Sequence, residues 1–448
     1  MSKRVVVLGG GISGYGSAIL AKKEGFEVLL SDSGRIAERY KARLDEWKVR
    51  YEEGGHSEEY ILGADEVIKS PGIPDKAPIV QKIRAKGIPV ISEMEFATRY
   101  STARTVCITG SNGKTTTTSL IYKILQDAGV NVGLGGNIGE SYAYQVATAE
   151  FDWYVLELSS FQLDGMFDFR ADVGVLMNIT PDHLDRYDYK FENYAASKLR
   201  ITQNQTADNQ FIYMADDAVI AEQMTQRTVN ARLLPFSKCD AQSEGGWIDG
   251  EMIRIKALDK EFTIDTRRMQ IKGIHNCYNA MAAAMAAVAV GVEPEKIVAS
   301  IESFGGVEHR LERAGVIDDV EYINDSKATN VDSVWYALES MTKPLVWIAG
   351  GTDKGNDYTP LVEFARAKIH TLVCMGLDNA KLVESFSGII PNIISTSSLD
   401  DAMTAARNAA HSGDVVLLSP ACASFDLFKN YEHRGEMFKQ WVANLQNK

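Results

Sequence analysis

The stretch RTVCITGSNGKTT, residues 104–116, combines a β-branched run, a glycine-rich turn and a threonine-rich helix start. Glycines let the backbone approach phosphate oxygens, and the N–H groups at a helix start favour an anion. Lys114 adds a positive charge, and a hydroxyl such as that of Thr115 can ligate Mg²⁺. The usual phosphate-binding loop has a glycine where Ile108 stands, so this loop is a shortened form. The stretch predicts a nucleoside triphosphate site that contains Gly110, Ser111, Asn112, Gly113, Lys114, Thr115 and Thr116.

The composition limits the classes of protein to which this chain can belong. Its 448 residues, 45% hydrophobic and 24% charged, suit a soluble globular chain of two to four domains. The net charge of −13 without a basic cluster argues against a nucleic-acid groove. The five cysteines are scattered without CxxC spacing, which is typical of reduced thiols. No secretory signal and no apolar run of about 20 residues is present, so we expect a cytoplasmic protein without a membrane span.

Residues 1–99 alternate short apolar strands with charged helical stretches, which predicts a Rossmann-like, doubly wound parallel sheet. The turn at residues 9–14 matches GxGxxG, and Asp32 closes the second strand where a ribose-binding acid would lie. This pattern is compatible with NAD, but the same geometry serves any nucleotide diphosphate, including a nucleotide sugar. The expected strands are Val5–Leu8, Glu27–Ser31, Glu66–Lys69 and Pro89–Ile91.

Residues 100–304 are expected to form a second α/β domain that opens with the phosphate-binding loop. Glu157 ends a buried strand, where a carboxylate suits a magnesium ligand; a strand-end carboxylate that faces water is the alternative. His183 follows the next strand, and taken alone it is more often a surface or hydrogen-bonded histidine. Asn276 and Asn279 share one helix face, where they could cap the helix or hydrogen-bond an adenine edge. A β-rich insert at 207–273 carries no recognisable chemistry.

Residues 305–448 are expected to form a third, Rossmann-like α/β domain. Polar segments stand at or near the carboxyl ends of its strands, where open parallel sheets bind ligands. Each cation taken singly could be a solvated side chain, but several at strand ends favour a ligand site. The expected strands are Val346–Ala349, Thr371–Met375, Ile393–Thr396 and Val415–Leu418. The polar segments are His309-Arg310, residues 324–330 (NDSKATN), residues 350–354 (GGTDK) and residues 419–425 (SPACASF).

Five motifs, in order over nearly the whole chain, resemble those of the Mur ligases of peptidoglycan synthesis: GSNGKTT, ELSSFQL, NITPDHLDRY, NDSKATN and LLSPACASFD. The first is shared by Mur and folylpolyglutamate ligases, whereas the last two resemble the members that add D-glutamate. The resemblance implies an ATP-dependent, amide-bond-forming ligase that releases ADP and phosphate. ATP would convert the carboxylate of UDP-N-acetylmuramoyl-L-alanine to an acyl phosphate, which D-glutamate would attack through a tetrahedral intermediate. The anions repel each other, so Mg²⁺ and cationic side chains must hold them together.

The resemblance also implies roles for residues of the second domain. Lys114 would contact the β- and γ-phosphates, Thr115 and Glu157 would hold one Mg²⁺, and His183 and Lys198 would hold a second. An ammonium group cannot ligate a cation, so Lys198 is expected as its carbamate, which resembles a carboxylate ligand. The expected catalytic residues are therefore Lys114, Glu157, His183 and Lys198.

Substrate-binding roles are likewise implied by the resemblance. Asn276 and Asn279 would bind adenine, Arg310 the phosphates and Asp325 the ribose of ATP. D-Glutamate would contact Lys327, Thr329, Lys354, Ser424, Phe425 and Tyr431. The uridine diphosphate would contact Ser13, Asp32, Ser33, Arg35 and Gly72, and Asn137 would approach the substrate's pyrophosphate. Gly34 inserts one residue into the pattern around Arg35.

Other interpretations stay open at this point. One is a ligase with a different acceptor, such as a folylpolyglutamate ligase or a ligase of a neighbouring Mur step. Another is an NAD-dependent oxidoreductase, and a third is a phosphate-binding switch without catalysis. We expect a monomer, and catalysis is expected to need domain closure about hinges near residues 99–103 and 303–306.

Overall fold

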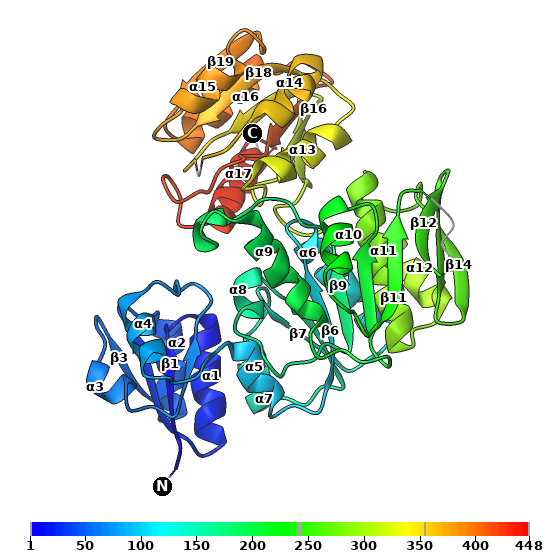
Figure 1. The fold of residues 1–448 in the computed structure, drawn as a ribbon. Helices are drawn as coiled ribbons and strands as arrows, with labels where there is room; N and C mark the ends of the chain where they lie inside the picture. The colour runs from blue at the N-terminus through cyan, green and yellow to red at the C-terminus, as the bar shows by residue number, and fades with distance from the viewer. Residues whose placement is uncertain (1, 240–243, 354, 447–448) are drawn as a thin grey trace. The chain divides into compact units, whose positions relative to one another are not determined.

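The computed structural model describes residues 2–239, 244–353 and 355–446, with the backbone alone for Asp185. The chain divides into two compact units, Met1–Met269 with Cys277–Phe304, and Gln270–Asn276 with Gly305–Lys448. This division falls at the second expected hinge, whereas the first expected hinge lies inside the first unit. Figure 1 shows the elements along the chain; the described strands form two sheets in the first unit and one in the second.

The first sheet has five described strands in the order β3-β2-β1-β4-β5, and the neighbouring strands are parallel, as predicted. The sequence does not predict β3, because Arg-Tyr-Glu-Glu lacks aliphatic residues, a composition that suits an exposed edge strand. The strands are β1 (Arg4–Leu8), β2 (Glu27–Asp32), β3 (Arg50–Glu53), β4 (Glu66–Lys69) and β5 (Val90–Ile91). The helices are α1 (Ile12–Lys23), α2 (Glu38–Glu46), α3 (Glu58–Ile61), α4 (Pro78–Ala85) and α5 (Glu93–Thr98).

The central sheet has nine described strands in the order β14-β13-β12-β11-β10-β9-β6-β8-β7. Each neighbouring pair between β7 at one edge and β12 is parallel. The last two pairs, β12 with β13 and β13 with β14, are antiparallel. The β-rich insert at 207–273 therefore extends the central sheet. The strands are β6 (Arg104–Thr109), β7 (Val132–Gly136), β8 (Trp153–Glu157), β9 (Val173–Leu176), β10 (Gln210–Met214), β11 (Arg232–Ser237), β12 (Gly245–Asp249), β13 (Met252–Ala257) and β14 (Lys260–Asp265).

The helices that accompany the central sheet include one in which a run of alanines is buried. Residues 280–287 of α11 are fully buried, so this Ala-rich segment is a core helix, as predicted. Among the residues that the structure describes, no helix is both long and apolar enough to cross a membrane. The elements are α6 (Lys114–Asp127), α7 (Tyr142–Thr148), α8 (Ser160–Leu163), η1 (Leu184–Arg186), α9 (Phe191–Leu199), η2 (Arg200–Thr202), α10 (Ala218–Thr225), α11 (Ile274–Val290) and α12 (Pro294–Ser303).

The third sheet has six described strands in the order β15-β16-β20-β17-β18-β19, with β15 and β16 antiparallel and the other pairs parallel. The strands are β15 (Glu312–Ile317), β16 (Val320–Asn324), β17 (Leu345–Ala349), β18 (Ile369–Met375), β19 (Asn392–Thr396) and β20 (Val415–Leu418). The helices are α13 (Val331–Ser340), η3 (Thr359–Leu361), α14 (Val362–Lys368), α15 (Ala380–Phe386), α16 (Leu399–Ala409) and α17 (Tyr431–Gln446).

The hairpin of β15 and β16 is absent from the sequence prediction, yet it positions the candidate site of this unit. Its turn uses Asp318 and Asp319 at φ 52° and 62°, a conformation that aspartate tolerates better than most residues. β16 pairs in parallel with β20, so that Asn324 lies beside Leu418. The segments that follow these strands, 325–330 and 419–425, therefore leave the sheet next to each other.

Burial on both faces explains the continuous apolar runs that predicted the central strands. Val106, Cys107 and Ile108 of β6 are fully buried, and every residue of β8 is buried. Parallel strands covered on both faces read as unbroken apolar segments. Burying one such aliphatic side chain contributes ~1.5–3 kcal/mol, so these strands form a rigid base for the loops at their carboxyl ends.

Candidate active site

The phosphate-binding loop lies where the sequence predicts it, between the end of β6 and the start of α6. Gly113 is the N-cap of α6 and has a left-handed φ of 82°, while Gly110 has a φ of 148°. A Cβ on Gly113 would lie 2.8 Å from Oδ1 of Asn279, and one on Gly110 would lie 2.9 Å from Cβ of Met177. Both the backbone angles and the close neighbours therefore require glycine at these two positions.

A neighbouring loop, which follows β9, braces the phosphate-binding loop. The hydroxyl of Ser111 donates to the Thr180 carbonyl at 2.9 Å and accepts from the Thr180 N–H at 2.9 Å. Asn112 N–H donates to Oδ1 of Asn178 at 2.8 Å, and Asn178 Nδ2 donates back to the Asn112 carbonyl at 3.1 Å. Asn178 and Thr180 were not among the predicted site residues, although both belong to the NITPDHLDRY motif. They shape the loop that would hold the phosphates.

Two lysines meet at one carbonyl of the phosphate-binding loop. Lys114 Nζ donates to the carbonyls of Gly110 at 2.7 Å and Ser111 at 2.9 Å. Lys198 Nζ, on α9, donates to the same Gly110 carbonyl at 2.8 Å and lies 4.6 Å from the ring centroid of Tyr194. Burial, and then the charge of Lys114, hold the pKa of Lys198 well below its usual range. Burial therefore disfavours the charged form of Lys198.

Glu157 is the last residue of β8, and only one of its two carboxylate oxygens has a hydrogen-bond partner among the described residues. Its Oε1 accepts from Asn137 Nδ2 at 2.8 Å, and its carbonyl accepts from the Asn137 N–H at 2.8 Å. Its Oε2 is buried and has no hydrogen-bond partner among the described residues. A buried carboxylate oxygen without a partner is costly unless a ligand satisfies it. Glu157 therefore fits a magnesium ligand, and Asn137 orients its carboxylate.

His183 lies in the loop between Thr180 and η1, at a left-handed φ of 51°. Its ring meets Phe161 edge-on, with the ring centroids 5.2 Å apart. Nε2 lies 3.6 Å from Oδ2 of Asp182, and the side chain is 41% exposed. The imidazole is thus accessible, in the same loop whose Thr180 contacts Ser111.

The two asparagines of α11 have different partners. Asn279 Oδ1 accepts from the Thr117 hydroxyl at 3.1 Å, and Asn276 Nδ2 donates to the Lys272 carbonyl at 2.7 Å. Both side chains are buried. Asn279 is therefore built into the start of α6 beside Gly113, whereas Asn276 ties its helix to the preceding turn.

In the first sheet, Asp32 connects the predicted glycine-rich turn to the loop after β2. Its carboxylate accepts from Gly10 N–H at 2.6 Å and from Gly34 N–H at 2.7 Å. Ser33 and Arg35 are exposed in this loop. The Asp32 carboxylate thus organises the backbone of the predicted uridine diphosphate site, and Ser33 and Arg35 remain accessible to a ligand.

Gly72 and Ser13 occupy different environments from the Asp32 loop. Gly72 is exposed in the turn after β4, and Ser13 is buried in the first turn of α1. Arg186, which was not predicted as a site residue, donates from Nη2 to the Pro71 carbonyl at 3.2 Å and lies over the Phe161 ring at 4.2 Å. Arg186 therefore links the Gly72 turn to the loop that carries His183.

In the second unit, the segments that follow β16 and β20 meet at Asp325. Its carboxylate accepts from Leu311 N–H at 3.2 Å and from the Ser419 hydroxyl at 2.7 Å. Burial raises its pKa to about 6, although the charge of Arg310 acts in the opposite direction. Lys327 N–H donates to the His309 carbonyl at 3.0 Å. The HR, NDSKATN and SPACASF segments therefore form one cluster.

Arg434 of α17 is the buried centre of that cluster. Its Nε and Nη2 donate to the hydroxyl and carbonyl of Ser326 at 2.9 and 2.8 Å, and its Nη1 and Nη2 lie 3.4 Å from the Cys422 carbonyl. Burial lowers its pKa to about 10, so it stays charged at neutral pH. The sequence did not single out Arg434, because its position in a polar helix looks like that of a solvated cation. The guanidinium binds both loops on which D-glutamate contacts were predicted.

The predicted D-glutamate residues are partly brought together. Lys327 Nζ lies 5.3 Å from the Tyr431 ring centroid, and the Tyr431 carbonyl accepts from the Ser326 hydroxyl at 2.8 Å. Ser424 is buried, while Phe425 is 71% exposed. Thr329 N–H donates to the Lys327 carbonyl at 3.0 Å. Lys354 lies outside the described residues.

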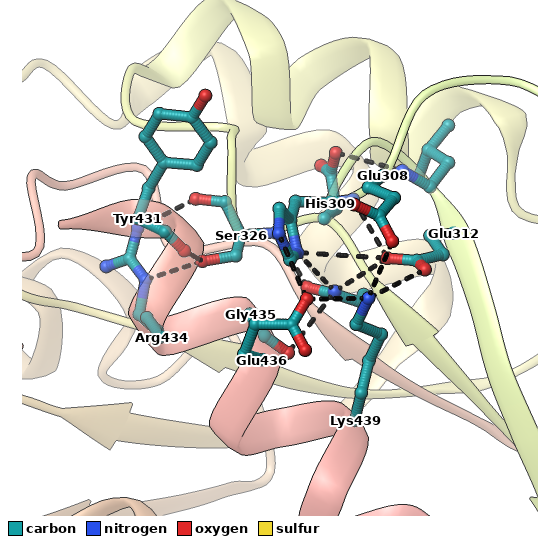
Figure 2. A network of polar contacts seen from close by, with 12 residues as sticks. Glu308, His309, Glu312, Ser326, Tyr431, Arg434, Gly435, Glu436 and Lys439 are labelled. Atoms are coloured by element: carbon teal, nitrogen blue, oxygen red, sulfur yellow. Dashed lines mark hydrogen bonds and ion pairs between the residues drawn. The ribbon is translucent and has the colours of Figure 1, made fainter.

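Figure 2 shows the polar network around His309, the residue that precedes Arg310 in the chain. Asn324 Nδ2 contacts His309 Nδ1 at 2.9 Å and donates to Glu312 Oε2 at 2.9 Å. Lys439 of α17 forms ion pairs with Glu308, Glu312 and Glu436 at 3.2, 3.2 and 2.8 Å. The network joins β15, β16 and α17, so the position of His309 depends on all three.

Comparison with known proteins shows which family the chain is related to. Residues 3–92 match the MurD-like N-terminal domain of Mur ligases, residues 108–287 the Mur ligase middle domain, and residues 309–422 the glutamate ligase domain. A Christiangramia forsetii protein called UDP-N-acetylmuramoylalanine--D-glutamate ligase is 50% identical over 445 residues, covering 99% of this chain and 100% of that protein. The chain belongs to the Mur ligase family.

Two further comparisons agree with the Mur ligase assignment. A Bacteroides fragilis protein of the same name is 51% identical over 445 residues, covering 99% of this chain and 100% of that protein. The structure of a UDP-N-acetylmuramate-alanine ligase from Thermotoga maritima has a TM-score of 0.62 at 17% identity, covering 98% of this chain and 99% of that one. At this identity the structural likeness shows the fold alone. The Mur ligase resemblance and the three-domain α/β fold expected from the sequence are confirmed.

Proposed function

We propose that this Mur ligase joins D-glutamate to the L-alanine carboxylate of UDP-N-acetylmuramoyl-L-alanine, with conversion of ATP to ADP and phosphate. The observation that carries the proposal is the 50% identity, over 99% of this chain, to a protein named for that reaction. The cluster of Lys114, Lys198 and Glu157 around the phosphate-binding loop supports the ATP chemistry. Membership of the Mur ligase family leaves the NAD-dependent oxidoreductase interpretation without support.

The reaction needs a carboxylate to be activated before an amine can attack it. In this proposal the N–H groups from Gly113 to Thr116, at the start of α6, bind the ATP phosphates. Lys114 exchanges the carbonyls of Gly110 and Ser111 for phosphate oxygens, because an anion is a better partner for an ammonium group. The γ-phosphoryl group passes to the substrate carboxylate, and the amine of D-glutamate then displaces phosphate through a tetrahedral intermediate.

Residues of the first unit supply suitable magnesium ligands. Glu157 Oε2 is buried without a hydrogen-bond partner in the described part of the chain, and Thr115 stands at the start of α6. When bound, Mg²⁺ neutralises charge on the phosphate and carboxylate oxygens. We assign Thr115 and Glu157 to one ion and His183 and Lys198 to a second.

Lys198 is proposed to act as a carbamate. A carbamate forms when a neutral amine attacks CO₂ and loses a proton, so a low amine pKa favours the reaction. The burial of Lys198 supplies that condition. The product would be an oxygen ligand suited to Mg²⁺.

The remaining assignments divide by substrate. For ATP we assign Asn276 and Asn279 to adenine, Arg310 to the phosphates and Asp325 to the ribose. For the uridine diphosphate substrate we assign Ser13, Asp32, Ser33, Arg35, Gly72 and Asn137. For D-glutamate we assign Lys327, Thr329, Lys354, Ser424, Phe425 and Tyr431. The exposed loop of Ser33 and Arg35 and the contact of Lys327 with Tyr431 support the last two sets.

The proposal extends to the working state of the protein. We propose three domains, at residues 1–99, 100–304 and 305–448, and a monomer that acts in the cytoplasm. The matches to three separate Mur ligase domains support this division. Sedimentation at equilibrium tests the monomer: a mass near 49.4 kDa supports it, and a multiple of that mass refutes it.

Phosphate release tests the reaction and its specificity together. The enzyme is supplied with ATP, Mg²⁺ and UDP-N-acetylmuramoyl-L-alanine, and the amino acid is varied over D-glutamate, L-glutamate, L-lysine, meso-diaminopimelate and L-alanine. We expect turnover with D-glutamate alone. Turnover with another amino acid would refute the acceptor assignment, and no turnover with any of them would refute the nucleotide-sugar substrate.

A further inference from the structure

Two histidines and one aspartate, none of them a predicted site residue, converge at the amino end of the third sheet. His370 is the second residue of β18, His411 follows α16, and Asp414 directly precedes β20. One ligand atom from each lies within 4.8 Å of the others. Figure 1 locates β18 and α16 in the second unit. The cluster therefore joins the start of β18 to the segment between α16 and β20.

The distances within this cluster suit a single bound ion. Asp414 Oδ2 lies 3.0 Å from His370 Nε2 and 3.4 Å from His411 Nδ1. Ligand atoms bound to one ion at about 2.0–2.2 Å lie roughly 3.0–3.5 Å apart in octahedral or tetrahedral geometry. The three groups could thus accept an ion with small movements of their side chains.

Further hydrogen bonds of His370, His411 and Asp414 orient these three residues. Asp414 Oδ2 accepts from the His411 N–H at 2.7 Å, and Asp414 N–H donates to the His411 carbonyl at 3.0 Å. His370 Nδ1 contacts the Thr371 hydroxyl at 3.0 Å, which leaves Nε2 directed at Asp414. Metal-binding histidines commonly use their second nitrogen in this way.

An open cavity gives access to the cluster. Its volume is about 510 Å³, and its lining includes His370, His411, Asn392 and Asn408. His411 is 80% exposed and His370 27%, whereas Asp414 is 7% exposed. An ion can therefore reach the two histidines from solvent, and the buried Asp414 carboxylate lies within 3.0 Å of His370 and 3.4 Å of His411.

The cluster is separate from the proposed ligase site of this unit. Asp325, Lys327 and Ser424 follow the carboxyl ends of β16 and β20, whereas this cluster lies at the amino ends of β18 and β20. Its ligand set also differs from a magnesium site, because imidazole nitrogen favours zinc and related transition metals while Mg²⁺ favours oxygen.

We propose that His370, His411 and Asp414 form a binding site for a divalent transition-metal ion, with zinc as the best fit. The ion would clamp the start of β18 to the turn before β20 and thereby stabilise the amino edge of the third sheet. This inference is independent of the proposed reaction. Without an ion, the same contacts form a histidine–aspartate hydrogen-bonded cluster, and binding measurements distinguish the two.

Equilibrium dialysis of the full, untagged chain against ZnCl₂ tests the site. Millimolar MgCl₂ is kept present so that the oxygen-rich magnesium sites are filled. We compare the parent with His370→Gln, His411→Ala and the control His433→Gln, which removes an imidazole of the same unit outside the cluster. We expect one zinc ion per parent chain from this site, at least a ~10-fold loss of affinity in the first two variants, and no change in the control.

Zinc binding and the melting temperature of His411→Ala distinguish this site from zinc bound elsewhere in the chain. Zinc held by Glu157 or His183 would remain in His411→Ala, so equal zinc binding by the parent and this variant would overturn the proposal. The melting temperature of the parent should rise with ZnCl₂ and that of His411→Ala should not. Because His411 is exposed, the variant should fold, and equal melting temperatures without zinc would show that it does. Absence of zinc binding by the folded parent would also overturn the site.

Discussion

Gly113→Ala is the most direct test of the phosphate-binding loop, because two separable costs can be worked from its surroundings. Alanine at the left-handed φ of 82° costs ~1–2 kcal/mol. The new Cβ would lie 2.8 Å from Oδ1 of Asn279, so that Asn279 must move away from Thr117. Loss of that hydrogen bond adds ~1 kcal/mol. We expect the free energy of unfolding of the first unit to fall by ~2–3 kcal/mol.

Gly129→Ala is the matched control for the backbone cost. Gly129 has nearly the same φ, 83°, and a Cβ there would meet nothing within 4 Å. This variant should therefore lose only the ~1–2 kcal/mol of the left-handed conformation. The difference between the two variants isolates the contact with Asn279. Any gain from a stiffer unfolded chain is common to both and cancels.

The assay combines stability with nucleotide binding. Urea unfolding gives the stability from the transition that ADP shifts to higher urea, since this is the transition of the unit that binds ADP. Calorimetry with ADP should show at least a ~10-fold weaker affinity for Gly113→Ala, because displaced N–H groups no longer fit the phosphates, and no change for Gly129→Ala. Equal stability losses in both variants, together with parental ADP affinity in Gly113→Ala, would refute the loop assignment.

Three further predictions address Lys198, Asp325 and Arg434. Lys198→Ala should abolish turnover, and acetate or formate should restore part of it if a carboxylate-like ligand is what the site has lost; no restoration would contradict the carbamate. Asp325 has a folded pKa of about 6 against an ordinary 3.8, so its contribution to stability is present below pH 3.8 and is lost as the pH rises through about 6. As the pH rises from 3.8 to about 6, the free energy of unfolding of Asp325→Asn should therefore rise by up to ~3 kcal/mol relative to that of the parent, measured by urea unfolding. A difference in stability that does not change with pH would contradict the burial effect. Arg434→Met should raise the KM for D-glutamate by ~10-fold or more with little change in the KM for ATP, because each lost charged hydrogen bond is worth ~1.5–3 kcal/mol. Equal effects on both KM values in Arg434→Met would point to general destabilisation instead.

The sequence predicted the elements whose signals are local. The segment 104–116 forms the expected strand, turn and helix start. The reason is that β-branched residues and glycines influence the backbone angles at their own positions. Glu157 was placed at the end of a buried strand from the apolar run before it. The strands β3 and β15 were missed, since they are edge strands where an apolar pattern is not needed.

The sequence by itself thus determined the phosphate-binding loop, the parallel α/β class and the family motifs. Only the tertiary structure decided which distant groups meet. Lys198 and Lys114 share the Gly110 carbonyl, and Arg434 holds Ser326 and Cys422 together. The physical reason is that desolvation and long-range hydrogen bonding depend on which strands pair and what covers them. Backbone preference is local, but the pKa of a buried lysine and the partners of a buried arginine are properties of the packed chain.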